Sequence, residues 1–234
     1  MAKRALKTTG GKLSAKAITR ILIVDDHALL REGLKELLNG ESHLEVCGEA
    51  AGEAEAMDLV RSTKPALVVV DIALEQGNGL DLIKRITAHG PSIRTIVCSM
   101  YDESLYAERA LRAGASGYVN KQAPAQTILA AITDVLAGEI FLSSHLTQRL
   151  VRRASGRLDQ PAKTPIETLS DRELQVFGLI GQGLATGQIA EKLHLSARTV
   201  ETYRERLKAK LNLKHAAELN RDAAQFWLLQ SRQS

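Results

Sequence analysis

The chain has 234 residues, of which 44% are hydrophobic and 25% charged, a composition typical of a globular protein with one or two domains. No apolar run approaches the length of a membrane span, and the N-terminus lacks a hydrophobic signal-peptide core, so a cytoplasmic protein without membrane contact is predicted. Cys47 and Cys98 are far apart and have no metal-ligand or redox spacing, which favours roles as small buried side chains.

The formal net charge of +4 is distributed unevenly along the chain. Residues 1–19 carry five basic and no acidic side chains, whereas residues 20–138 carry 11 basic and 17 acidic ones, a balance of −6. Residues 139–165 have 5 basic and 2 acidic side chains, and residues 166–234 have 10 and 8. An acidic unit between basic segments suggests two domains with different partners.

The first part of the chain is predicted to be a disordered basic arm followed by an α/β domain. Residues 1–18 mix Lys, Gly, Thr and Ala without periodicity, and this arm either contacts nucleic acid or has no role. Beyond it, short apolar runs alternate with amphipathic helical patterns. Five such repeats predict a doubly wound, five-stranded parallel sheet covered on both faces, within residues 19–138. The runs cover residues 21–24, 44–48, 66–70, 94–99 and 117–119.

The C-terminal part is predicted to be a linker followed by a small all-α domain. Residues 139–165 break the strand–helix rhythm and are predicted to be a linker that is partly helical near its start. In residues 166–234 we expect four helices. Ser170 and Glu173 have the spacing of a capping box at the start of the first, and Ser196 caps the third. The later three helices are expected near residues 188–193, 197–211 and 215–229.

Polar side chains follow four of the predicted strands. Asp25 and Asp26 follow the first, Asp71 the third, Ser99 the fourth and Lys121 the fifth. Because the carboxyl ends of parallel strands share one edge of a sheet, these groups are expected to converge on one crevice. An isolated Asp after a strand is usually a turn or cap residue, but this ordered set is much harder to obtain by accident. Three carboxylates need a counter-charge, and oxygen ligands favour Mg²⁺.

With Mg²⁺ bound, one carboxylate could attack phosphorus and form an acyl phosphate. Asp71 is the best nucleophile because it stands alone at the end of its strand, whereas Asp25 and Asp26 are better placed to hold the metal. The Lys121 ammonium and the Ser99 hydroxyl would then contact the phosphoryl oxygens.

The segments VDDH, VVVDIALEQGNGLDLI, VCSM and GYVNKQAP resemble the receiver domain of bacterial two-component response regulators, over about residues 19–138. The resemblance implies that Asp71 accepts a phosphoryl group from a sensor histidine kinase. It also implies that Asp25, Asp26, Asp71 and the carbonyl of Ala73 hold Mg²⁺.

By the same resemblance, further residues take part in sensing the phosphoryl group. Ser99 and Lys121 become phosphate-sensing groups, and Tyr118 becomes the rotating aromatic of the switch, with simple buried packing as its alternative. The chain departs from the family pattern at Glu75, where a proline is common. His27 invites a catalytic role, but we interpret it as a helix-start residue.

The segment from LSDRELQVFG to LKAKLNL resembles the LuxR-type helix-turn-helix domain, which with the receiver makes the chain similar to NarL/FixJ-type response regulators. The resemblance implies a transcription factor that binds double-stranded DNA, as a homodimer when phosphorylated. A helix over residues 197–211 would lie in the major groove. The side chains expected to face bases are Glu201, Thr202 and Glu205 or Arg206, and those expected to anchor the backbone are Arg198, Thr199, Arg204 and Lys210.

One residue of this domain departs from the family pattern, and its last helix has two alternative roles. Glu201 stands where a lysine is often found, and a glutamate can accept a hydrogen bond from cytosine. The last helix carries Leu219, Ala223, Phe226 and Trp227, which would either pair two DNA-binding domains or belong to the core of one.

Two other functions compete with that of a phosphorylation-controlled regulator. We do not expect an enzyme, since the receiver would only promote its own phosphorylation and dephosphorylation. A Mg²⁺-dependent phosphohydrolase would need a substrate-binding insertion or a lid, and none is apparent in the sequence. The second alternative is a constitutive DNA-binding protein whose receiver packs but never signals.

Overall fold

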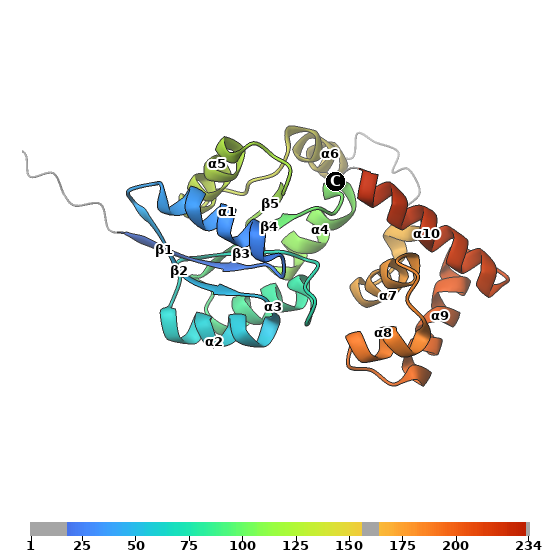
Figure 1. Cartoon of the computed structure of the whole chain (residues 1–234). Coiled ribbons are helices and arrows are strands. Elements are labelled where there is room, and N and C mark those ends of the chain that lie inside the picture. The colour runs from blue at the N-terminus through green and yellow to red at the C-terminus, as the bar shows by residue number, and fades with distance from the viewer. Residues whose placement is uncertain (1–17, 156–163, 233–234) are drawn as a thin grey trace, which may run out of the picture.

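Five parallel strands form one sheet in the order β2-β1-β3-β4-β5 (Figure 1). The structure is a computed structural model that describes residues 18–155 and 164–232, so the predicted basic arm lies outside the described residues except for Ile18. The strands are β1 (Thr19–Val24), β2 (Leu44–Ala50), β3 (Leu67–Val70), β4 (Arg94–Ser99) and β5 (Gly117–Asn120). The helices between and after them are α1 (Ala28–Asn39), α2 (Glu53–Thr63), α3 (Gly79–His89), α4 (Glu103–Ala113) and α5 (Ala125–Leu136).

Helices cover both faces of this sheet, as predicted for a doubly wound fold. Successive strand residues point to opposite faces, so Ile21 and Ile23 lie in one core with α1 and α5, whereas Leu22 and Val24 lie in the other with α2, α3 and α4. The inner strands β1, β3 and β4 are buried on both sides over most of their length, which explains their nearly continuous apolar sequences, whereas the edge strand β2 is mostly half-buried.

The start of α3 brings a helix very close to the end of β3. The side chain of Asn78 caps α3 by accepting a hydrogen bond from the backbone N–H of Leu80 at 2.8 Å. The next residue, Gly79, lies against the backbone of Asp71, and a Cβ atom there would come within 2.8 Å of the Asp71 carbonyl carbon. Glycine is therefore required at this position by close approach of two backbone segments.

The C-terminal part is helical (Figure 1). Its elements are α6 (Ser144–Ala154), the 3₁₀ turn η1 (Pro165–Thr168), α7 (Asp171–Gly181), α8 (Thr186–Lys192), α9 (Ala197–Leu211) and α10 (Ala216–Arg232). Helix α6 lies within the segment predicted to be a linker, and the four helices α7 to α10 agree with prediction. The expected capping box is present, since Ser170 N–H donates to Glu173 Oε2 at 2.8 Å and Glu173 N–H donates to Ser170 Oγ at 3.3 Å.

The core of the C-terminal domain is centred on α7 and α10. The rings of Phe177 and Phe226 lie 5.3 Å apart, and Leu219 and Ala223 are fully buried. Core packing therefore accounts for three of the four apolar residues noted on the last helix, and the fourth, Trp227, is half-buried.

Among the described residues, no helix has both the length and the apolar character needed to cross a bilayer.

Candidate functional site

The polar groups that end the strands meet around Asp71, as the sequence predicts. Ser99 Oγ donates to Asp71 Oδ1 at 2.8 Å, and Lys121 Nζ lies 2.7 Å from Asp71 Oδ2. The same ammonium lies 2.6 Å from Asp25 Oδ2, so it bridges two carboxylates. All of these residues come from the carboxyl ends of β1, β3, β4 and β5, where a parallel sheet gathers its functional groups.

Burial and charge both act on the ionisation of this cluster. The side chains of Asp71 and Lys121 are 3% and 4% exposed. Burial raises the pKa of Asp71 above its ordinary value, and the adjacent Lys121 ammonium limits that rise. Burial opposes the charge of Lys121, but Asp71 and Asp25 outweigh it and raise the pKa of Lys121. Lys121 therefore keeps its proton and serves as the resident cation of the site.

The donor set suits a hard divalent cation. Single ligand atoms of Asp25, Asp26, His27 and Asp71 lie within 4.8 Å of one another. Asp26 Oδ1 is buried and has no hydrogen-bond partner, although His27 Nδ1 lies 2.8 Å away. Three carboxylates around a space with one unsatisfied oxygen fit Mg²⁺, which prefers oxygen ligands. His27 is the N-cap residue of α1, in agreement with its interpretation as a helix-start residue.

Two other predicted site residues lie next to this cluster. The backbone N–H of Ala73 donates to Asp71 Oδ1 at 3.3 Å, which places the following loop over the carboxylate. Tyr118 is buried, and its hydroxyl donates to the carbonyl of Tyr101 at 2.7 Å. In this structure Tyr118 is a packed, buried side chain, which was the alternative to its role in the switch. Its rotation on phosphorylation stays a prediction.

The predicted recognition helix is α9, and several of its polar side chains already have partners. Glu201 and Thr202 are exposed, and the Thr186 hydroxyl donates to Glu201 Oε1 at 2.7 Å. Arg204 donates to Asn220 Oδ1 at 2.9 Å. Further contacts on this helix join Thr202 to the Arg198 carbonyl, Lys208 to Glu205, Lys210 to Glu173, and the Arg206 guanidinium to the Tyr203 ring.

Known protein families match both parts of the chain. Residues 21–133 match the response regulator receiver domain, and residues 167–223 match the luxR family of bacterial regulatory proteins. The chain is 33% identical over 201 residues to the DNA-binding transcriptional activator DevR/DosR of Mycobacterium tuberculosis, covering 86% of this chain and 92% of that protein. The chain belongs to the two-component response regulators. It carries a receiver domain and a LuxR-type helix-turn-helix domain that binds DNA in transcription control.

Other relatives of this response regulator support the same assignment. It is 35% identical over 204 residues to the oxygen regulatory protein NreC of Staphylococcus aureus, covering 86% of this chain and 94% of that one. A LuxR-family response regulator from Aurantimonas sp. shares 33% identity and a TM-score of 0.55, over 59% of this chain and 99% of that one. RcsB of Salmonella typhimurium, at 22% identity, shares the fold with a TM-score of 0.68 over 89% and 98% of the two chains.

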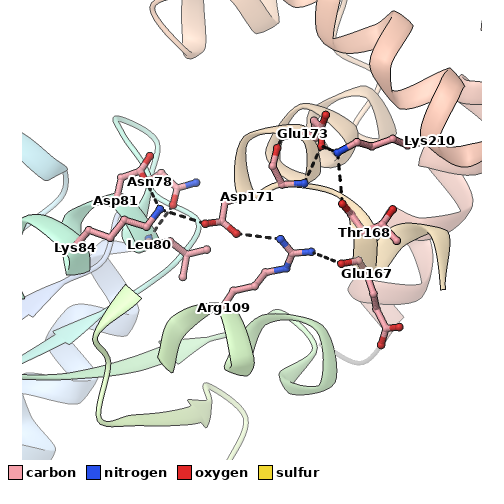
Figure 2. A network of polar contacts seen from close by, with 11 residues as sticks. Asn78, Leu80, Asp81, Lys84, Arg109, Glu167, Thr168, Asp171, Glu173 and Lys210 are labelled. Atoms are coloured by element: carbon pink, nitrogen blue, oxygen red, sulfur yellow. Dashed lines mark hydrogen bonds and ion pairs between the residues drawn. The ribbon is translucent and has the colours of Figure 1, made fainter. Parts of the chain in front are cut away.

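One group of contacts in this response regulator was not predicted. Asp171, the first residue of α7, contacts Arg109 from α4 and Lys84 from α3, and thus joins the two domains (Figure 2). The sequence offers no signal for this contact, because each of the three residues lies on a helix where a charged side chain is ordinarily solvated.

Proposed function

We propose that this response regulator is switched by transfer of a phosphoryl group from a sensor histidine kinase to Asp71. The observation that carries the proposal is the position of the Asp71 carboxylate, held by Ser99 on one oxygen and by Lys121 on the other, beside Asp25 and Asp26. One oxygen of Asp71 attacks phosphorus, the bond from phosphorus to the kinase histidine nitrogen breaks, and that nitrogen keeps the electron pair.

The residues around Asp71 have separate roles in this proposal. Mg²⁺ would be held by Asp25, Asp26, Asp71 and the Ala73 carbonyl, and it would supply a divalent charge against the carboxylates and the phosphoryl oxygens. Lys121 now pairs with both Asp25 and Asp71 and offsets one of their two charges, and it stays close enough to bind a phosphoryl oxygen on Asp71. Ser99 would exchange its present bond to Asp71 for one to the phosphoryl group.

The phosphoacceptor role is tested by treating the full chain with acetyl phosphate and Mg²⁺ and measuring its mass. We expect a gain of one phosphoryl group, which Asp71→Asn abolishes. Asp58→Asn, on the exposed surface of α2, is the matched control and should react normally. A stable phosphoryl group on the Asp71→Asn chain would contradict the assignment. Continuous release of phosphate from a phosphomonoester, lost in Asp71→Asn, would instead favour the phosphohydrolase.

We also propose that α9 reads DNA in the major groove. Thr202 and Glu201 are exposed on one side of the helix and would face base edges, together with Glu205 or Arg206. Arg198, Thr199, Arg204 and Lys210 would contact the phosphate backbone. After phosphorylation, two chains would bind neighbouring half-sites as a homodimer.

Binding measurements with variants of α9 test this assignment. Arg204→Ala should weaken binding to all sequences and reduce the salt dependence by about one unit. Thr202→Ala should instead change sequence preference, costing about 1–3 kcal/mol on the preferred site. Arg61→Ala, which removes an exposed charge on α2, controls for net charge. If both α9 variants bind like the unaltered chain, the recognition helix is wrongly assigned.

A further inference from the structure

The helix-turn-helix domain lies over the carboxyl edge of the sheet, where the phosphoacceptor site is located (Figure 1). A cavity of about 410 Å³ separates the two domains and is lined by both. Its receiver side includes Asp71, Ser99 and Lys121, and its other side includes Gln182, Phe226 and Trp227. The phosphoacceptor therefore faces the C-terminal domain across a confined space.

A single acidic side chain holds the domains together on one side of this cavity (Figure 2). Asp171 Oδ1 lies 3.0 Å from Arg109 Nη1, and Asp171 Oδ2 lies 3.2 Å from Lys84 Nζ. Arg109 Nη2 also donates to the carbonyl of Glu167 at 3.3 Å. Two receiver helices thus direct cations at the N-terminus of α7.

The burial of Arg109 makes this contact important for docking. Its side chain is 5% exposed, and Asp171 is the acidic group that the structure pairs with it. A buried guanidinium that loses its carboxylate is costly, so Arg109 favours the docked arrangement as long as Asp171 is present. Two neutral contacts add to it, from the Asp102 N–H to Gln230 Oε1 at 2.9 Å and from Gln175 Nε2 to the Gly77 carbonyl at 3.4 Å.

We propose that Asp171 is an interdomain clasp that holds the DNA-binding domain over Asp71 and thereby controls how readily Asp71 takes up a phosphoryl group. The inference rests on the proposed role of Asp71 as phosphoacceptor. A phosphoryl donor must approach the Asp71 carboxylate from the cavity, and the far wall of that cavity is formed by α7 and α10. Docking and phosphorylation are therefore competing states, and each disfavours the other by the same factor.

The docked arrangement leaves the proposed DNA-reading surface uncovered. Glu201 and Thr202 are exposed on α9, whereas Phe226 and Trp227 of α10 line the cavity at the receiver. The clasp thus acts on the phosphoacceptor and on α10, and does not act by covering the recognition helix.

Titration of the full chain with beryllofluoride in the presence of Mg²⁺ tests the clasp. Trp227 is the only tryptophan of the chain and lies at the cavity, so its fluorescence reports both ligand uptake and domain separation. We expect Asp171→Asn to lower the half-saturating beryllofluoride concentration by about 5- to 150-fold, the usual range for coupling between two sites. Native mass spectrometry counts the bound beryllofluoride independently.

Variants on the receiver side separate the clasp from any effect on α7 itself. Arg109→Gln should lower the half-saturating concentration like Asp171→Asn, and the double variant should add little, because both changes remove one contact. Lys84→Gln, at an exposed position, should act in the same direction without disturbing the fold. Asp58→Asn makes the same chemical change in an exposed ion pair with Arg61 within α2 and should leave the titration unchanged.

Two outcomes would overturn the proposal. One contradicts the clasp alone, and the other also contradicts the phosphoacceptor role of Asp71. If Asp171→Asn and Lys84→Gln bind beryllofluoride at the same concentration as the unaltered chain, the clasp is wrong while the phosphoacceptor site stands. If no chain binds beryllofluoride, by fluorescence or by mass, then the phosphoacceptor assignment fails and the clasp fails with it.

Discussion

Replacing Gly79 by alanine should disturb the proposed phosphoacceptor site through the backbone alone. Gly79 is the first residue of α3, and its Cα lies against the chain segment that carries Asp71. An added Cβ would come within 2.7 Å of Ile72 Cα and nearer still to the Asp71 carbonyl oxygen. The substitution changes no charge and removes no hydrogen bond, so its effect reports packing only.

The expected loss of stability follows from two opposing terms. Ordinary contact of a Cβ begins at about 3.4 Å, so α3 would have to move by at least ~0.7 Å from Ile72. Overpacking of this kind costs about 1–3 kcal/mol, and more when the obstacle is backbone. Alanine gains up to about 1 kcal/mol over glycine in a helix. The steric term is larger, so we expect Gly79→Ala to lower the free energy of unfolding by about 2 kcal/mol.

Urea-induced unfolding followed by circular dichroism measures this change, and Gly33→Ala is the matched control. Gly33 lies in α1 of the same domain, and a Cβ there would meet nothing within 4 Å. The control should therefore be stabilised, by about 0.5–1 kcal/mol. Asp71 in the Gly79→Ala chain should also react more slowly with acetyl phosphate, because its backbone is displaced. A Gly79→Ala chain as stable as the unaltered one would refute the reasoning.

Three further predictions concern single polar contacts. Burial opposes the charge of Glu173, but Lys210 and the Ser170 N–H outweigh it, so the pKa of Glu173 lies below its ordinary value of 4.5. The ionised carboxylate therefore adds stability above about pH 4.5 that is lost as the pH falls through the folded-state pKa. Thermal unfolding of Glu173→Gln should show about 1–2 kcal/mol less stability at pH 7 and a smaller further loss in acid. Asn78→Ala removes the cap of α3 and should cost about 1 kcal/mol in urea unfolding, whereas an unchanged midpoint would mean that the cap contributes nothing. Tyr118→Phe leaves the Tyr101 carbonyl without its donor and should cost about 1 kcal/mol in thermal unfolding, with equal stability as the contrary result.

The sheet was predictable because apolar strands and amphipathic helices alternate along the sequence. Its site was predictable because polar residues directly follow the strands. Buried parallel strands are apolar throughout, and their carboxyl ends share one edge, so the residues after the strands identify the site. Asp25, Asp71, Ser99 and Lys121 could be placed together for this reason. What the sequence could not show is that Lys121 bridges Asp25 and Asp71 and is the resident cation of the cluster.

The contacts between domains were not predictable from any pattern. The sequence pattern predicts that Arg109 is an ordinary surface cation on an amphipathic helix, but in the structure its side chain is buried against Asp171. Its environment depends on the docking of a second domain about 60 residues later in the chain, and no periodicity or motif encodes that arrangement. Similarly, Lys210 was expected to contact DNA, but it also neutralises the buried Glu173 of its own domain.

The ion pairs of α9 alter how many counterions DNA binding can release. The helix has five basic side chains, namely Arg198, Arg204, Arg206, Lys208 and Lys210. Two of them, Lys208 and Lys210, are already neutralised by Glu205 and Glu173. A cation with its own carboxylate displaces little salt from a phosphate, so α9 should count as about three charges in the salt dependence of binding. The electrostatic contribution of α9 to DNA binding should therefore be smaller than its five basic side chains suggest.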